Sequence, residues 1–564
     1  MGGFKRSVAS SAAILLVSAG LLAVTPLTAS AAESYWVEPT GNLTVSGRGF
    51  GHGRGMSQYG AQGAALAGRT STQILDFYYP GTQNKALGAT IVRVHVTADT
   101  TAGVKVLATT GLRARDLGSN AVWTLPVQST ISQWEIRPHL SSQTRLYYYR
   151  TGSSTGVLWR TLSGMAQFEG PAVTRLVMPS GSSVPYRGTL RAADRSGADL
   201  DTINVVSIDY YLRGVVPKEA ITSWRPAALQ AQAVAARTFA ASKLGSHSDY
   251  DLCDTISCQV YGGYAAEVAS TNAAVVATSN RIRTYNGNPI LAEFSSSNGG
   301  YTTPSPVPYQ VGKADPYDGY SGNGNPNTSW TASVNRTTAQ ARFAVGTIKQ
   351  LSVLSRNGLG TWGGRVLTLR VVGTSSTKTF TGDQVRSLLG LKSTWIRFNQ
   401  SRIMQRWVAI GGATSPVGVS LGYEWPVRGG TGQTFSKGHI YRTASYGAVE
   451  IYPGFETRYQ AIGGPNHTLG LPIAPRSAGA RPGSQLQRFG NGRMWYSAAT
   501  GVREVSGRIY TAYYGAGLEG GRLGLPVSYQ YSVTFSTTAG AQQRFQGGYI
   551  NWYASNNTTA VVYT

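Results

Sequence analysis

The pattern of apolar and polar positions predicts one prominent helix, over residues 227–244. Apolar residues recur there at spacings of four, three, four and four, which places them on one helical face. Pro226 precedes the segment and Gly245 follows it, as is typical of helix ends. Gln230 and Arg237 lie two turns apart on another face, so we expect both to point into one cleft. The apolar face consists of Leu229, Ala233, Ala236, Ala240 and Leu244.

Most of the remaining pattern before residue 401 is typical of β-strands. Segments 92–96, 146–149 and 366–372 are rich in β-branched and aromatic residues, several of them with alternation. Between about 95 and 200, clusters of Ser, Thr and Gly separate short strands, which predicts a β-rich portion or insert. We therefore assign residues 32–400 to one larger unit of the α+β class.

Residues 401–564 contain a sequence repeat. Phenylalanines follow Gln-Thr or Gln-Arg at positions 435, 489 and 545, and Leu-Gly-Leu-Pro recurs at 469–472 and 523–526. Leu421-Gly422 is the diverged first copy of that element in our interpretation. Regular self-similarity predicts a stacked array. Because each unit is small and rich in Gly and aromatic residues, we expect neighbouring units to close one another's core.

The amino-terminal segment 1–31 is typical of a secretory signal peptide. Lys5 and Arg6 precede an apolar core, and Ala29-Ser30-Ala31 matches the pattern that signal peptidase cleaves. The apolar core is interrupted and shorter than the roughly 20 residues that span a bilayer. We therefore expect a secreted protein, with a retained membrane anchor as the alternative.

The charge of the chain indicates its class of partner, and its two cysteines indicate a cross-link. Lys and Arg outnumber Asp and Glu by 50 to 25, which favours a polyanionic partner. For an exported chain we expect anionic cell-wall polymers and no nucleic acid; a solvated basic surface is the alternative. In an exported chain Cys253 and Cys258 favour a disulfide, and a zinc site with His247 is the alternative. We predict no cofactor.

Glu219 is the candidate for acid–base chemistry. It follows Pro217, in what we interpret as an irregular connection before the predicted helix. Its apolar neighbours would desolvate the carboxyl group and raise its pKa, as a general acid at neutral pH requires. The alternative is a structural glutamate that favours the positive end of the following helix. The apolar neighbours are Val215, Val216, Ile221 and Trp224.

Several ordered motifs between residues 47 and 398 identify a family. They are 51–61 (GHGRGMSQYGA), 209–219 (DYYLRGVVPKE), 231–238 (AQAVAART), 253–254 (CD), 258–261 (CQVY), 295–302 (SSSNGGYT) and 389–395 (LGLKSTW). Together they resemble the stage II sporulation protein D (SpoIID/LytB) family. The Gly-Gly, Leu-Gly-x-Pro and Phe-x-x-Gly elements after residue 402 resemble LGFP repeats, which implies attachment to the cell wall.

The SpoIID resemblance implies a β-rich catalytic domain that is a lytic transglycosylase of peptidoglycan glycan strands. Glu219 matches the family's catalytic glutamate and Arg237 matches a functional arginine, which would bind the lactate carboxylate of the sugar. Gln230 stands where the sporulation enzyme has a functional lysine, and we expect it to bind a hydroxyl or N-acetyl group.

His52 and the serine-rich turn at Ser297 are the remaining candidates for substrate contact. Their neighbouring glycines are equally compatible with a purely structural role. Glu293 is a candidate second carboxylate, which a hydrolytic glycosidase would need.

One glutamate is sufficient for a lytic transglycosylase. It first protonates the glycosidic oxygen and then accepts the proton of the muramic acid C6 hydroxyl, which attacks in place of water. Some relatives act as modifiers of wall amidases. The alternative function is therefore a non-catalytic wall-binding protein that modifies or recruits another hydrolase, with wall amidases as partners.

Overall fold

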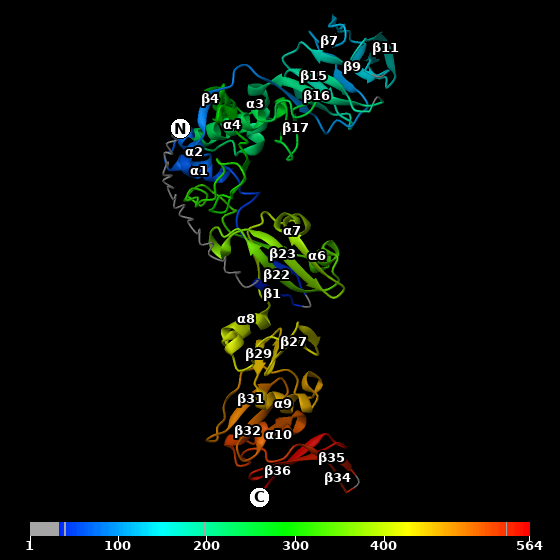
Figure 1. Ribbon diagram of the computed structural model, residues 1–564. Helices are drawn as coiled ribbons and strands as arrows, with labels where there is room; N and C mark the ends of the chain where they lie inside the picture. The colour runs from blue at the N-terminus through cyan, green and yellow to red at the C-terminus, as the bar shows by residue number, and fades with distance from the viewer. Residues whose placement is uncertain (1–32, 39–40, 141, 197, 537) are drawn as a thin grey trace, which may run out of the picture.

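The computed structural model describes residues 33–38, 41–140, 142–196, 198–536 and 538–564. The predicted signal peptide, 1–31, lies outside the described residues. Within them, none of the helices combines the length and the apolar character needed to traverse a bilayer. The architecture is mixed α+β, and the repeat region is β-rich (Figure 1). The fold class is therefore confirmed at this level.

A group of helices lies next to the glycine-rich amino-terminal motif, residues 51–61 (Figure 1). Helix α4 occupies its centre and packs against four other helices and strand β18. A short 3-10 helix, η1 (Tyr264–Ala266), lies beside α3. The elements of this group are α1 (Gln58–Leu66), α2 (Ser71–Tyr78), α3 (Ile208–Glu219), α4 (Pro226–Ala241), α5 (Ala269–Ala277) and the sheet β19 (Asn288–Pro289), β18 (Arg281–Tyr285), β4 (Gln83–Ala86).

The prominent helix is confirmed, with a shorter carboxyl end than predicted. Four of its five stripe residues are buried. The fifth, Leu244, follows the end of α4 and is 40% exposed. The buried face ends with Ala240 and Ala241, and none of the residues 242–244 that follow is buried.

The prediction of a single prominent helix is wrong, because α3 is a second one. The Ser207 side chain accepts a hydrogen bond from the backbone of Tyr210 and so caps the helix. Pro217 lies in the last turn, where it removes one backbone donor without breaking the helix. Glu219 is therefore the last residue of α3 and does not lie in an irregular connection.

Residues 91–207 form two sheets over one core, which extends to α3 and α4. Their strands pair antiparallel, and β17, from later in the chain, adds to the second sheet in parallel with β5. The predicted strand 92–96 is β5, and 146–149 is β10. The first sheet has the order β11 (Gly156–Thr161), β10 (Thr144–Arg150), β9 (Ile131–Pro138), β6 (Val104–Leu107), β13 (Thr174–Val177), β14 (Ser183–Tyr186). The second has the order β17 (Leu252–Cys253), β5 (Ile91–His95), β16 (Leu200–Ser207), β15 (Thr189–Asp194), β12 (Ala166–Glu169), β7 (Arg113–Asp116), β8 (Val122–Thr124).

A further core joins the start of the described chain to residues 330–398. The predicted strand 366–372 is β23. The elements are the sheet β1 (Glu33–Trp36), β22 (Ile348–Arg356), β23 (Val366–Gly373), β24 (Thr377–Thr381), the sheet β21 (Trp330–Val334), β2 (Leu43–Gly47), β25 (Ile396–Phe398), the helices α6 (Arg336–Phe343) and α7 (Gly382–Leu389), and the 3-10 helix η2 (Thr361–Gly363). The parallel pair β20 (Phe294–Ser295), β3 (Met56–Ser57) packs instead in the core of the helical group.

Each repeat consists of a short helix, a 3-10 turn and a four-stranded antiparallel sheet. The first has α8 (Arg402–Ala409), η3 (Gly412–Thr414), β26 (Trp425–Val427), β27 (Gly430–Phe435), β28 (Gly438–Thr443) and β29 (Gly447–Ile451). The second has α9 (Pro453–Ala461), η4 (Gly464–Asn466), β30 (Ser477–Ala478), β31 (Gln485–Phe489), β32 (Gly492–Ser497) and β33 (Gly501–Ser506). The third has α10 (Gly507–Gly515), η5 (Leu518–Gly520), β34 (Tyr531–Phe535), β35 (Thr538–Phe545), β36 (Gly548–Tyr553) and β37 (Thr558–Tyr563).

Neighbouring repeats share their cores, as predicted. Tyr441 and Ile451 of the first sheet pack with Tyr459 of α9 and with Phe489 and Met494 of the second sheet. A single unit therefore could not bury these side chains by itself.

The first copy of the Leu-Gly-Leu-Pro element is not at Leu421. Ser420 forms the same isolated bridge to Phe435 that Pro472 forms to Phe489, and Gly418 has the positive φ of Gly470. The structural equivalent is therefore 417–420 (VGVS), and Leu421 is 62% exposed. The assignment failed because the first copy keeps only the glycine and the apolar volume of the motif.

Candidate active site

Glu219 ends α3 on the side of the helix that faces the rest of the helical group. The backbone N–H of Val260 donates a hydrogen bond to Oε1 at 3.1 Å, and the side-chain amide of Gln58 donates one to Oε2 at 3.4 Å. Both partners are uncharged. The residue as a whole is largely buried but keeps some exposed surface. The protein therefore orients the carboxyl group within a residue that keeps part of its surface exposed.

Burial raises the pKa of Glu219 above its usual value, and the two hydrogen bonds only partly oppose this effect. The position at the end of α3 acts in the same direction, because the carboxyl end of a helix carries partial negative charge. The alternative interpretation, a glutamate at the positive end of the following helix, is wrong because α4 begins only at Pro226 and has no acidic residue in its first turn. The raised pKa favours the protonated form that a general acid needs.

The donor Gln58 belongs to the glycine-rich motif 51–61 and is buried in the first turn of α1. Sequence reasoning singled out His52 from this motif and missed Gln58. The position of the motif, 161 residues before Glu219, gives no signal of contact. An amide within a motif of the resemblance was the only available indication.

The other donor, Val260, follows the disulfide between Cys253 and Cys258. Cys253 lies on β17, which pairs with β5. The Tyr261 hydroxyl donates a hydrogen bond to Oδ1 of Asn204 at 2.8 Å, so the motif CQVY is fixed at both ends. The disulfide loop therefore holds the backbone donor of Glu219 in place.

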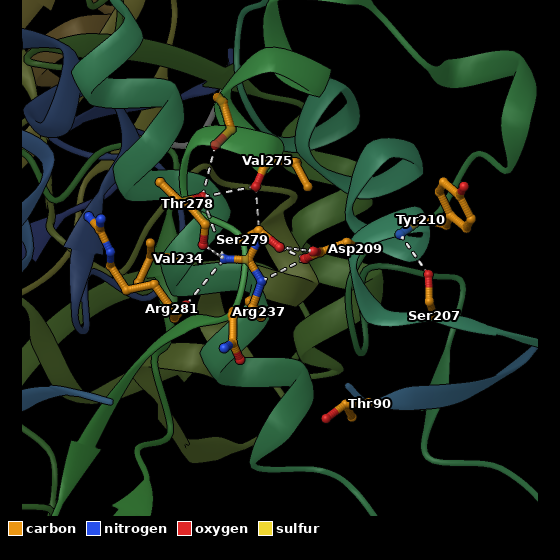
Figure 2. Close-up of polar contacts among 12 residues, drawn as sticks. Thr90, Ser207, Asp209, Tyr210, Val234, Arg237, Val275, Thr278, Ser279 and Arg281 are labelled. Atoms are coloured by element: carbon orange, nitrogen blue, oxygen red, sulfur yellow. Dashed lines mark hydrogen bonds and ion pairs between the residues drawn. The ribbon is translucent and has the colours of Figure 1, made fainter. Parts of the chain in front are cut away.

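Figure 2 shows that Arg237 lies in a closed cluster of α3, α4 and α5. Its side chain is fully buried and forms an ion pair with Asp209, at 2.9 Å. Its Nη1 also donates to the carbonyl oxygens of Thr278 and Arg281, and its Nη2 to that of Val275. The prediction that Arg237 points into a cleft with Gln230 is therefore wrong, since its donors are used within the protein.

Ser297 is also buried, contrary to the prediction of a substrate contact. Its hydroxyl donates to Oδ2 of Asp318 at 2.9 Å, and the hydroxyl of Ser57 donates to Oδ1 of the same carboxylate. The backbone N–H groups of Asn298 and Gly299 bind Asp318 as well. The serine-rich turn is thus fixed to the start of α1 and supports the position of Gln58.

His52 keeps partial exposure, and its Nδ1 accepts a hydrogen bond from the Arg54 backbone at 2.9 Å. Burial and the charge of Arg54 lower the pKa of His52 to about 4, so the ring is neutral near pH 7. Arg54 also binds both oxygens of Glu293, at 2.9 and 2.7 Å. Burial opposes ionisation of Glu293, but Arg54 outweighs it and holds the pKa of Glu293 below its usual value.

Gln230 is partly exposed on α4, and the ring of His247 stacks on that of Tyr250 at 4.4 Å. In the described part of the chain, His, Cys, Asp and Glu side chains form no group that could hold a metal ion. The cysteines of the alternative zinc site are joined in the disulfide.

Comparisons with known proteins agree with both resemblances. Residues 196–285 match the stage II sporulation protein (SpoIID) family, and residues 469–521 match the LGFP repeat. The first match includes Glu219 and Val260 but not Gln58. The resemblance to the SpoIID family and to LGFP repeats is therefore confirmed for these segments.

Two relatives from Bacillus subtilis (strain 168) illustrate the extent of similarity. The chain is 41% identical to the amidase enhancer over 131 residues, which are 22% of this chain and 17% of that protein. It is 30% identical to stage II sporulation protein D over 216 residues, which are 34% of this chain and 60% of that protein. The chain thus matches less than two thirds of the length of either relative.

Proposed function

We propose that the chain is a secreted, wall-bound lytic transglycosylase that cleaves the β-1,4 bond between MurNAc and GlcNAc with Glu219 as its only acid and base. The observation that carries the proposal is the state of Glu219. It is a partly exposed residue whose carboxyl group has a raised pKa and two uncharged hydrogen-bond donors. The similarity to stage II sporulation protein D supports a role in remodelling the cell wall.

The proposed reaction needs no second carboxylate. Protonated Glu219 gives its proton to the glycosidic oxygen as the bond to C1 of MurNAc breaks. The C6 hydroxyl of the same sugar then attacks C1, and the Glu219 carboxylate accepts the hydroxyl proton. The products are a 1,6-anhydro end and a free 4-hydroxyl, and the enzyme returns to its protonated form. Gln230 and His52, both partly exposed, are the proposed contacts to the sugar.

Hydrolysis through Glu293 is less well supported. A base or nucleophile needs a free carboxylate oxygen opposite the acid, and both oxygens of Glu293 are bound to Arg54. The repeats are proposed to hold the protein to the wall, which agrees with their match to the LGFP family.

The test is digestion of purified glycan strands by the full chain and by Glu219→Gln, with mass analysis of the strand ends. Lys218→Gln, an exposed neighbour, is the matched control. Anhydro ends with the wild type and the control, but not with Glu219→Gln, are the expected result. Reducing ends would indicate hydrolysis, and activity in Glu219→Gln would exclude Glu219 as the acid.

A second candidate is a non-catalytic protein that stimulates or recruits a wall amidase. The identity of 41% to a segment of the amidase enhancer favours it. Intact strands with every variant, together with faster release of stem peptides when a wall amidase is added, would support this function over the first.

A further inference from the structure

The repeats separate their charges between interior and surface. Residues 402–564 contain no aspartate and five glutamates, and all five glutamates are buried. Arg406 binds Glu450 and Arg458 binds Glu504 at equivalent places in the first two repeats, and His439 contacts Glu456. The exposed charged side chains of the repeats are therefore all basic. The buried acids are Glu424, Glu450, Glu456, Glu504 and Glu519.

A groove of about 940 Å³ lies where the first two repeats meet the start of α10, the helix of the third repeat. The turns after β26 and β28, the loop that follows η4 and the first turn of α10 surround it. Among its lining residues are two arginines from different repeats, Arg428 and Arg508, and two tyrosines, Tyr446 and Tyr510. Tyr446 is 57% exposed. The lining contains no acidic residue.

The groove also offers uncharged donors. Nδ1 of His467 accepts the backbone N–H of Leu469 at 3.2 Å, so the ring carries its proton on Nε2 as a donor. Burial lowers the pKa of His467. No side chain caps the amino-terminal end of α10. The N–H of Gly507 donates to the carbonyl oxygen of Asn491, and the N–H groups that follow it add partial positive charge beside Arg508.

The next junction, between the second and third repeats, is built differently. The loop between β30 and β31 spans residues 479–484, where the first repeat has only 428–429. Arg481 of this longer loop donates to the carbonyl oxygens of Glu519 and Gly521, and the backbone of Ala480 donates to the Glu519 carboxylate. The longer loop thus occupies, at the second junction, the position that corresponds to the open groove at the first junction.

We propose that the groove between the first two repeats binds a wall glycan that carries anionic groups, either phosphodiesters or uronates. Arg428 and Arg508 pair with two successive anionic groups, and the tyrosines stack on the intervening sugar rings. This inference rests on the proposed wall attachment and names its site and ligand class. Charge on the remaining surface supplies attraction at longer range, which salt screens.

The test measures binding of the full chain to three polymers at low and physiological salt: poly(glycerol phosphate), polygalacturonate and neutral dextran. We expect binding to one or both anionic polymers and not to dextran, and the two anionic arms distinguish phosphodiester from uronate. Arg428→Gln with Arg508→Gln should weaken binding by roughly tenfold or more, since each arginine contributes on the order of fivefold. Tyr446→Ala should weaken it without changing the salt dependence.

Arg488→Gln with Arg544→Gln is the matched control, because it removes the same charge from exposed strand positions outside the groove. Equal weakening by both double variants would overturn the proposal, and so would equally tight binding of double-stranded DNA. The proposed reaction is tested separately, by the formation of anhydro ends on purified glycan strands that carry no other wall polymer. If those ends form while the groove variants still bind normally, only the groove assignment fails.

Discussion

The side-chain amide of Gln58 donates a hydrogen bond to the carboxylate of Glu219, at 3.4 Å. The two residues come from the first turn of α1 and the last residue of α3. Through this contact the glycine-rich amino-terminal motif takes part in setting the protonation of the candidate acid.

Replacing Gln58 should change the pH dependence of strand cleavage. The amide lowers the pKa of Glu219, so Gln58→Ala should raise that pKa further. A general acid loses activity as it deprotonates, and the alkaline limb of the kcat/KM profile should therefore move to higher pH. The lost orientation should reduce the maximum by roughly threefold to tenfold. Gln62→Ala, one turn further along α1, is the control and should leave the limb in place.

Glu219 should make the fold less stable at neutral and alkaline pH. Its pKa is raised in the folded state, so its contribution to stability is complete below the unfolded pKa and is lost as pH rises through the folded pKa. Glu219→Gln keeps an acceptor for Val260 and carries no charge. We expect its melting temperature to exceed that of the wild type at pH 8 and to approach it at pH 4. A lower melting temperature at pH 8 would contradict the raised pKa.

The disulfide should matter for activity as well as for stability. Replacing Cys253 and Cys258 by Ala opens a short loop and should cost about 2 kcal/mol of unfolding free energy. Because the loop holds the backbone donor Val260, kcat should fall even at temperatures where the variant is folded. Chemical reduction of the wild type should reproduce both effects. Unchanged kcat in the folded variant would show that the loop keeps its position without the cross-link.

Arg237 should be a stability residue and not a substrate contact. Arg237→Met removes the fully buried cation that pairs with Asp209, together with its hydrogen bonds to three carbonyl oxygens, and should cost about 3–5 kcal/mol in denaturant unfolding. At a temperature where the variant is folded, KM for glycan strands should stay within twofold of the wild type. Arg225→Met, an exposed arginine before α4, should change stability by less than about 0.5 kcal/mol. A large rise of KM with intact stability would restore the original assignment.

The local sequence pattern was sufficient to predict a helix or strand where the apolar positions of one face define the element. The apolar spacing of 227–244 predicted α4, and alternation predicted β5, β10 and β23. It failed for α3, whose Pro217 and β-branched residues argue against a helix when burial of the helix face is unknown. The sequence pattern also failed for the first repeat, where residues 417–420 keep the backbone conformation of the motif but not its amino-acid sequence.

The sequence by itself determined that the chain carries a SpoIID-like segment with one conspicuous glutamate, followed by repeats that must stack, because motifs and periodicity are properties of neighbouring residues. Only the tertiary structure decided which side chains surround that glutamate. Gln58 and Val260 reach it from segments far apart in the chain. Arg237 and Ser297 are equally conspicuous in the sequence, but their polar groups bind partners inside the protein. Burial depends on contacts between distant segments, and burial decides whether a polar group is available to a substrate.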